Sequence, residues 1–377
     1  MRRGREQAEI GEAMAGQARR LRWKKRFAEV VRDWMNRERI PAPAHALLYG
    51  LSLGYGAAVA ARSALYERGV FRSRSLDCRV VSVGNLTVGG TGKTPVTMYV
   101  ASRLRRMGRR VAILSRGYGG SVKETAVVSD GSAVLLGPAE AGDEPCLMAR
   151  RLEGVPVLVG PERLRTGERA VREFSADVVV LDDGFQHLAL RRDLDILLVD
   201  GRRGLGNGHL LPRGLLREPP QAAVRAGLVM VKEPRGGERP PFLPARLRAP
   251  VVGFHYRPAS LREVHGGGRL DTAALRGARV AALCALADPD SFVRTLEELG
   301  AAVSSRLFYP DHHAYTPADM ERIAAASRGA DLCVTTEKDA VKLAQLDPRD
   351  SAIHALAVDV VVDDEETLDK TLSTVAL

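Results

Sequence analysis

The sequence lacks any close pairing of cysteines. Its 377 residues include four, Cys78, Cys146, Cys284 and Cys333, and each lies far from the others along the chain. Without a C-x-x-C pair, the sequence supports neither a zinc ribbon nor a disulfide framework. The cysteine spacing therefore fits a protein of a reducing compartment.

Aromatic residues are scarce, and acidic residues are outnumbered by basic ones. The aromatic content of 5% argues against base stacking as a main binding mode. The formal net charge of +10 suits an anionic partner, which could be nucleic acid, an acidic lipid or a phosphorylated substrate. Hydrophobic residues make up 45% and charged residues 27%, as in globular proteins, and the length predicts two domains.

Residues 42–61 contain no formally charged side chain. The run is just long enough to cross a bilayer, but glycines dilute its hydrophobicity. The segment before it, residues 1–40, is too long and too mixed in charge for a signal peptide, and we expect a basic, partly disordered extension. We predict that residues 41–70 form an apolar helix on a membrane surface, anchored by upstream basic residues. The alternative is a helix packed on the protein's own core.

Residues 80–95 read VVSVGNLTVGGTGKTP. An apolar run, a glycine-rich turn and a Gly-Lys-Thr triplet are the strand, loop and helix start of a P-loop, whose backbone N–H groups cradle phosphates. The usual spacing has a glycine where this chain has Thr87, so an ordinary glycine-rich turn is the alternative. The predicted nucleoside triphosphate site consists of Thr87, Val88, Gly89, Gly90, Thr91, Gly92, Lys93 and Thr94.

Short apolar runs alternate with segments of helical spacing along most of the chain. Residues 110–115, 155–159 and 177–181 are examples of such runs. Their alternation predicts a parallel sheet that is buried on both faces. The predicted fold class is α/β, with a P-loop NTPase-like core, a second, smaller α/β domain and an N-terminal membrane-associated helix. Thr316 and Pro317 predict the start of a helix in the second domain.

A Pro-, Gly- and Arg-rich segment at residues 235–250 predicts a linker. We therefore expect a P-loop core at residues 71–234 and a C-terminal α/β domain at residues 251–377. Within the core, residues 203–222 form a Gly/Pro-rich loop that is too long for a simple connection. Loops of this length in compact domains are usually functional.

The sequence VVVLDDGFQH follows the pattern of an apolar strand that ends in two carboxylates, Asp182 and Asp183. Ligands of open α/β sheets bind at the carboxyl ends of the strands, so these carboxylates and the P-loop should converge. We predict that one of these carboxylates, Asp182, reaches a Mg²⁺ ion that is held by Thr94 and the phosphates. Solvated acids at strand ends are common, however, and this pattern is informative only in combination with the P-loop.

Further candidate site residues lie at the ends of predicted helices and strands or in the loops between them. Asp143 and Glu144 open a helix, where carboxylates are often only dipole partners; the functional alternative is a general base or a metal-shell carboxylate. His312, in the segment Asp-His-His, is either part of a surface turn or part of a site. Arg116 and Arg217 could each bind phosphate with two hydrogen bonds.

Several stretches occur together in the order expected of one family. They are VVSVGNLTVGGTGKTP, SRGYGG, AGDEP, LDDGFQH, DILLVDGRRGLGNGHLLPRGLLREP, PDHHAYT and VTTEKDAVKL, from about residue 80 to residue 343. In these stretches the chain resembles the tetraacyldisaccharide 4'-kinases, the lipid A 4'-kinases of Gram-negative bacteria. The hydroxylated Thr87 in the P-loop is itself a feature of that family. The Arg-rich extension before residue 40 departs from the family pattern.

The resemblance implies phosphoryl transfer from ATP, with Mg²⁺, to the 4'-hydroxyl of an acylated glucosamine disaccharide 1-phosphate at the cytoplasmic face of the inner membrane. It implies an inner-membrane lipid surface as a partner, and no nucleic acid. It assigns Asp143 as the base, with His312 oriented against it. It places Asp182 and Asp183 in the metal shell, with Glu144 nearby. Lys93 and Thr94 would serve the phosphates and Mg²⁺. The second-tier candidates that it implies are Gln186, His187, Tyr118, Arg116 and Arg217.

Three alternative functions remain open from the residues alone. A partitioning-type ATPase usually has a lysine where this chain has Val88. A GTPase would read guanine with N-K-x-D, but Glu337 replaces the asparagine in the sequence Thr-Glu-Lys-Asp. A basic nucleic-acid-binding protein with an incidental nucleotide fold would bind DNA or RNA in a salt-sensitive way without turnover.

Overall fold

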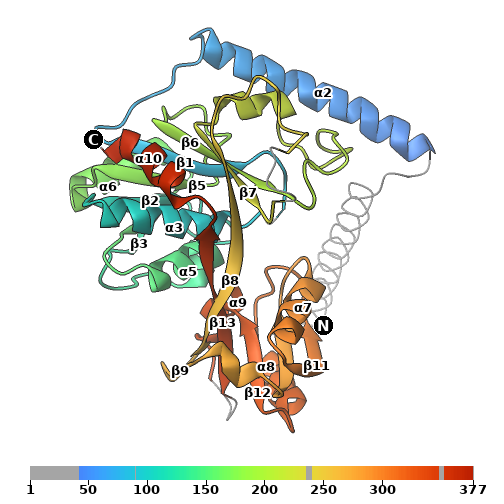
Figure 1. Ribbon diagram of the computed structural model, residues 1–377. Coiled ribbons are helices and arrows are strands. Elements are labelled where there is room, and N and C mark those ends of the chain that lie inside the picture. The colour runs from blue at the N-terminus through green and yellow to red at the C-terminus, as the bar shows by residue number, and fades with distance from the viewer. Residues whose placement is uncertain (1–41, 90, 235–239, 348–351, 377) are drawn as a thin grey trace, which may run out of the picture.

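The computed structural model describes residues 42–89, 91–234, 240–347 and 352–376. The predicted basic extension at 1–40 and the predicted phosphate ligand Gly90 lie outside the described residues, as does part of the predicted linker. The α/β fold class is confirmed: one 13-stranded sheet is covered by helices on both faces. Figure 1 shows an upper part that holds most of the parallel strands and a smaller lower part.

The sheet has the strand order β11-β10-β12-β13-β8-β7-β6-β1-β5-β2-β4-β3, and β9 pairs with β8. The predicted parallel core is confirmed from β7 to β4, whereas β3 and the β8–β13 pair are antiparallel. The strands are β1 Arg79–Asn85, β2 Val111–Ser115, β3 Ala126–Ser129, β4 Val157–Val159, β5 Val178–Asp182, β6 Leu194–Asp200, β7 Leu228–Lys232, β8 Val251–Glu263, β9 Arg269–Leu270, β10 Arg279–Cys284, β11 Ala302–Phe308, β12 Leu332–Thr336 and β13 Ile353–Val362.

Helices cover both faces because the parallel strands are apolar throughout. In β5, for example, all residues are buried, so neither face can be left to solvent. The helices are α2 Ala42–Glu67, α3 Lys93–Arg106, α4 Pro138–Ala141, α5 Asp143–Arg151, α6 Arg163–Phe174, α7 Pro289–Glu298, α8 Pro317–Ser327, α9 Glu337–Leu343 and α10 Glu365–Ala376, with short 3₁₀ turns at Pro220–Arg225 and Thr272–Leu275. Helix α8 begins at the predicted residue, with the Thr316 side chain accepting a hydrogen bond from the Asp319 backbone N–H.

The upper part has a core on each face of its sheet. Helices α3, α5 and α10 pack on one face and α6 packs on the other. Because α10 ends the chain, the C-terminal residues return to the upper part, where Leu368 and Leu372 are fully buried. The predicted linker is also packed, since Leu243 and Leu247 join a core with β6 and β7. The division of the chain into domains at residues 235–250 stays a prediction.

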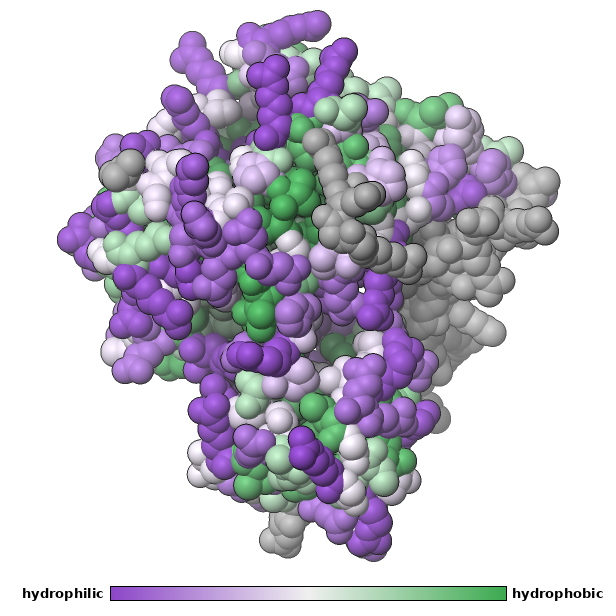
Figure 2. Space-filling view, viewed as in Figure 1, coloured by the Kyte–Doolittle hydropathy of each residue, from purple (hydrophilic) through white to green (hydrophobic). Residues whose placement is uncertain are grey.

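A two-stranded ribbon joins the two parts of the molecule. Strand β8 pairs with β7 only at Val251–Phe254 and then runs on, paired antiparallel to β13, into the lower part. Figure 2 shows the narrower lower part below the wider upper part. The long strand β8 was not among the predicted strands.

Helix α2 confirms the predicted apolar helix and lies across the top of the molecule in Figure 1. The segment Pro43–Glu67 has a mean hydropathy of 1.2 in its most apolar window, and only 11% of that window is buried, so by length and composition it could cross a membrane. One side of it contacts the long loop 203–222: Ser52 Oγ donates to Leu210 O at 2.8 Å and Tyr55 Oη to Arg217 O at 2.9 Å.

Helices α5 and α9 form the main helix contact between the two parts. Arg151, at the end of α5, pairs with Glu337, the first residue of α9, at 2.6 Å. Arg151 also donates to Asp359 of β13 at 3.1 Å, and the Val358 N–H donates to Glu337 at 3.2 Å. Burial raises the pKa of Glu337, with Arg151 opposing that effect, so removal of Arg151 would leave a poorly solvated carboxylate.

We expect Arg151→Met to destabilise the protein by about 3 kcal/mol, because a buried ion pair that loses one partner leaves an uncompensated charge. Urea unfolding measures this loss. The matched control is Arg150→Met, on the exposed side of the same helix, which should unfold like the parent protein. Equal stability of the two variants would show that the Arg151–Glu337 pair does not hold the parts together.

Candidate active site

The predicted phosphate loop follows β1 directly and leads into α3, as the sequence indicates. Gly89 and Gly92 adopt positive φ values of 108° and 82°, which side chains with a Cβ rarely tolerate. Asn85, fully buried at the end of β1, donates to Thr91 Oγ1 at 2.8 Å and to Thr87 Oγ1 at 3.4 Å. Asn85 therefore holds the loop through the hydroxyl groups of Thr91 and Thr87, and Thr87 contributes to the structure of the loop.

Lys93, the first residue of α3, folds back over the loop. Its Nζ donates to Asn85 Oδ1 at 3.4 Å and to Gly89 O at 3.5 Å, and it lies 3.7 Å from Asp183 Oδ1. These contacts are long for hydrogen bonds of a charged donor. The ammonium is thus held near the loop by weak partners and is available to a stronger anion.

Asp182 ends β5, the strand beside β1, so the chain brings it to the phosphate loop as predicted. Val83 and Asp182 are register partners in the two strands. Its carboxylate accepts from Thr97 Oγ1 at 3.1 Å and from Ser115 Oγ at 3.3 Å, and it is 3% exposed. Burial, together with the charges of Glu144 and Asp183, raises the pKa of Asp182 to about 7.

The surroundings of Asp182 suit a divalent cation. No lysine, arginine or histidine among the described residues forms an ion pair with it, and the charges of Lys93 and Arg163 act on it only from a longer distance. The side chains close to it offer oxygen, which is what Mg²⁺ prefers. No group of three His, Cys, Asp or Glu side chains gathers into a metal cluster in the described part of the chain. Mg²⁺ is usually held by one or two carboxylates plus phosphates, so Asp182 fits such a site.

Asp183 has a different environment from Asp182. Arg217 Nη1 contacts both of its carboxylate oxygens, at 3.0 and 2.9 Å, and also donates to Gln186 Oε1 at 3.1 Å. Arg217 Nη2 donates to Asn85 Oδ1 at 3.1 Å. The long loop 203–222 is thus tied to the phosphate loop and to the end of β5 through one guanidinium group.

Asp143 and His312 come together from the two parts of the molecule. Asp143 opens α5, and its Oδ2 lies 3.3 Å from His312 Nδ1 and 3.5 Å from Lys342 Nζ. Burial raises the pKa of Asp143, but the hydrogen bond from His312 and the charge of Lys342 outweigh burial, so its pKa lies below the usual value. The carboxylate is therefore ionised at neutral pH and can accept a proton.

His312 is held from several sides. Lys338 Nζ lies 3.2 Å from its Nε2, and the Tyr118 ring meets its ring edge-on at 5.6 Å between centroids. A lysine that donates to Nε2 requires the tautomer with the proton on Nδ1, and that proton then points at Asp143. His312 has φ of 59°, which is uncommon for a residue other than glycine and is characteristic of functional sites.

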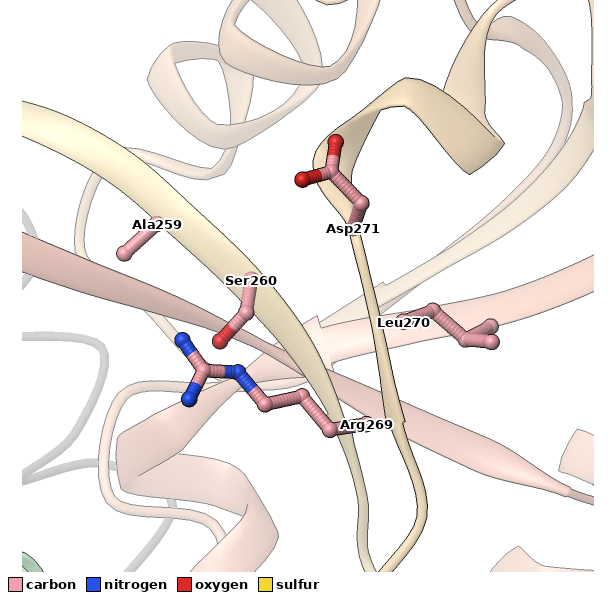
Figure 3. A pocket seen from close by; sticks show the side chains of 5 residues that line it. All are labelled: Ala259, Ser260, Arg269, Leu270 and Asp271. Atoms are coloured by element: carbon pink, nitrogen blue, oxygen red, sulfur yellow. The ribbon is translucent and has the colours of Figure 1, made fainter.

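The other predicted residues lie around this centre. Glu144 is close enough for its charge to act on Asp182. Burial and nearby arginines lower the pKa of His187 to about 4, so it is neutral. Arg116 is exposed. The depression in Figure 3, with a volume of about 360 Å³, contains none of the predicted residues: it is lined by Ala259, Ser260, Arg269, Leu270 and Asp271 beside β9.

Sequence reasoning missed three side chains of the site: Asn85, Lys338 and Lys342. The two lysines stand in VTTEKDAVKL, a stretch that marks the family resemblance but had no role assigned to it. Their spacing of four residues on a helix places both on one side, toward Asp143 and His312, and that spacing was the available signal. Asn85, inside the P-loop stretch, carried no separate signal.

Comparisons with known proteins show what the whole chain is similar to. The sequence model of the family described as Tetraacyldisaccharide-1-P 4'-kinase matches residues 44–376. A tetraacyldisaccharide 4'-kinase of Anaeromyxobacter dehalogenans (strain 2CP-C) is 50% identical over 318 residues, covering 81% of each chain. The enzyme of that name from Geobacter metallireducens is 43% identical over 333 residues, covering 88% of this chain and 98% of its own. A crystal structure of LpxK from Aquifex aeolicus in complex with ATP superposes with a TM-score of 0.75 at 32% identity, over 89% of this chain and all of that one.

Because the pKa of Asp182 is raised, we predict that Asp182→Asn increases the free energy of unfolding of protein without nucleotide or metal, and that this increase depends on pH. The folded pKa of about 7 lies above the ordinary value of 3.8, so the folded state keeps a proton that the unfolded state has lost, and stability falls as pH rises between these values. Asparagine does not titrate. We expect a gain of about 1–3 kcal/mol at pH 8 that disappears below about pH 4.

Urea unfolding in EDTA at several pH values measures this difference. The control is Asp130→Asn, at an exposed carboxylate whose pKa is lowered by hydrogen bonds from Ala133 and Ser132, and it should give no gain in stability at any pH. If Asp182→Asn increased the free energy of unfolding equally at pH 4 and at pH 8, the raised pKa of Asp182 would be refuted.

Proposed function

Because this chain belongs to the tetraacyldisaccharide 4'-kinase family, we propose that its P-loop holds ATP while Asp143 and His312 act on the acceptor hydroxyl. The protein is an ATP-dependent kinase of lipid A biosynthesis, which phosphorylates the 4'-hydroxyl of tetraacyldisaccharide 1-phosphate. Family membership decides between this kinase and the ATPase, GTPase and nucleic-acid-binding alternatives. The contact of Asp143 with His312 is the observation that carries the proposed roles.

The proposed donor site comprises Thr87, Val88, Gly89, Gly90, Thr91, Gly92, Lys93 and Thr94. Backbone N–H groups of the loop and of the first turn of α3 point at the phosphates, and the positive end of the helix dipole adds to their attraction. Lys93 would leave its weak contacts with Asn85 and Gly89 for the phosphate oxygens. Arg217, held beside the loop, is placed to neutralise charge that develops on the transferred group.

Mg²⁺ is the proposed cofactor, and Asp182 with Thr94 would hold it. When bound, Mg²⁺ neutralises phosphate charge and orients the phosphates for in-line attack. Asp182 supplies a buried carboxylate that has no ion-pair partner among the described residues, and the charge of Glu144 acts on it. Asp183 joins this shell less directly, since Arg217 and Lys93 already contact its oxygens.

Asp143 is the proposed base. Its ionised carboxylate takes the proton of the 4'-hydroxyl as the hydroxyl oxygen attacks the γ-phosphorus, and ADP leaves with the electrons of the broken bond. His312 and Lys342 orient the carboxylate and stabilise its charge before the acceptor arrives. Since the base and its partners come from different parts of the molecule, the site is complete only when the parts are together, which limits transfer to water.

The proposed partner surface is the cytoplasmic face of the inner membrane. Helix α2 exposes Leu47, Leu51 and Leu53, at 64, 53 and 59%. The same helix also contacts the loop that carries Arg217 through Tyr55. An acceptor with several acyl chains stays in the bilayer, so an apolar helix linked to an active-site loop brings the two together. The net charge of +10 suits acidic lipids and a substrate that carries a 1-phosphate.

We expect Asp143→Ala to lower kcat by about 10³-fold, because a positioned base contributes roughly 10²–10⁴ to proton transfer, while ATP binding stays intact. The assay follows label from γ-labelled ATP into tetraacyldisaccharide 1-phosphate, beside a sample with water as the only acceptor. Asp130→Ala, which removes an exposed carboxylate that bonds only within its own turn, is the matched control. Near-normal turnover by Asp143→Ala would refute its role as the base.

We expect the triple variant Leu47→Ser, Leu51→Ser, Leu53→Ser to bind vesicles of acidic phospholipid at least about tenfold more weakly, given the transfer free energy of exposed leucines. Cosedimentation of the full chain measures this affinity. The control, Val134→Ser with Leu135→Ser, removes apolar side chains that are exposed elsewhere. Vesicle binding that falls equally in both variants, or in neither, would contradict docking through α2.

A further inference from the structure

Tyr256 lies where the ribbon leaves the upper sheet. The last register pair of β8 with β7 is Phe254 with Lys232, and two residues later Tyr256 pairs with Val360 of β13. Strands β8 and β13 connect the two parts of the molecule in Figure 1. The Lys232 ammonium lies 4.9 Å from the centre of the Tyr256 ring, and the Phe254 ring meets it edge-on at 5.8 Å.

The hydroxyl of Tyr256 reaches the phosphate loop. Tyr256 Oη donates to the carbonyl oxygen of Gly92 at 3.0 Å, across 164 residues of sequence. A Cβ at position 92 would come within 1.5 Å of this hydroxyl, so the loop approaches the ribbon as closely as a glycine allows. Burial raises the pKa of Tyr256, and the charges of Asp200 and Glu233 raise it further, so the hydroxyl keeps its proton and donates at every physiological pH.

This hydrogen bond also constrains the orientation of the peptide unit between Gly92 and Lys93. A peptide unit is planar and trans, so the C=O of Gly92 and the N–H of Lys93 point in opposite directions. With its carbonyl held on Tyr256, the Gly92–Lys93 peptide must point the Lys93 N–H away from the ribbon. The other acceptor contact of this carbonyl, from the Val96 N–H, is long at 3.4 Å and holds the plane weakly. The orientation of the first helix N–H therefore depends on the ribbon.

We infer that Tyr256 is a positioning residue through which strand β8 orients the Gly92–Lys93 peptide for a nucleoside triphosphate. The inference rests on the proposed function, in which this loop holds ATP. It links the strand that carries the lower part, with His312 and Lys342, to the loop that binds the donor. A displacement of the ribbon at Tyr256 would change the direction of the Lys93 N–H at the phosphate site. Conversely, a bound triphosphate would restrict movement of the ribbon.

The test is Tyr256→Phe in the full-length protein, which removes the hydroxyl and keeps the ring. We expect the Kd of a non-hydrolysable ATP analogue with Mg²⁺, measured by calorimetry, and the KM for ATP to rise about fivefold, as for one lost hydrogen bond. The KM for the lipid acceptor and kcat at saturating ATP should not change, because Asp143 and His312 are untouched.

Two further variants make the outcomes distinct. Tyr99→Phe removes a hydroxyl from the same helix α3, where it donates to Glu365 at 3.0 Å, and should leave ATP binding unchanged. Lys93→Ala tests the proposed phosphate loop itself. Unchanged ATP affinity in Tyr256→Phe, or an equal loss in Tyr99→Phe, would overturn the inference while Lys93→Ala still abolishes binding. Normal ATP binding by Lys93→Ala would instead refute the proposed donor site.

Discussion

The arrangement of this protein depends on the ionised carboxylate of Asp143, which is half-buried between two parts of the chain. Burial disfavours the charge, and only groups from the other part, His312 and Lys342, make it stable. Because Asp143 belongs to the upper part and its partners belong to the lower part, the contact between the two parts belongs to the site. The packing of α5 on α9, which includes the Arg151–Glu337 ion pair, therefore stabilises the fold and also keeps Asp143 beside His312 and Lys342.

Two neighbouring carboxylates show how the same side chain acquires different roles from its surroundings. Asp183 is neutralised by Arg217 and Lys93, so it organises the loop around the donor site. Asp182 accepts hydrogen bonds from hydroxyl groups and has no ion-pair partner among the described residues, and its pKa is raised by burial and by the charges of Glu144 and Asp183. A bound cation would offset that electrostatic cost, which is why we propose Asp182 before Asp183 as the metal ligand.

The sequence predicted what depends on local pattern and missed what depends on contacts across the chain. Apolar runs located β5, and a hydroxyl followed by proline located the start of α8 at Thr316. The family motifs pointed to Asp143 and His312, which lie 169 residues apart. Strand β8 was missed because only one end of it is buried on a parallel neighbour, so its burial pattern is not that of a core strand. Asn85 and Tyr256 act through hydrogen bonds that no periodicity encodes.

These contacts suggest why donor and acceptor sites occupy one continuous sheet. The phosphate loop is held by Asn85 at the end of β1, by Arg217 of the loop that contacts α2, and by Tyr256 of the ribbon. Arg217 and Tyr256 each belong to an element that also contacts another part of the molecule, α2 for the loop of Arg217 and the lower part for β8. A rigid loop on an isolated domain could bind ATP whether or not an acceptor was present. A loop held by elements that reach α2 and the lower part binds ATP best when those elements are in place, which reserves the triphosphate for the lipid.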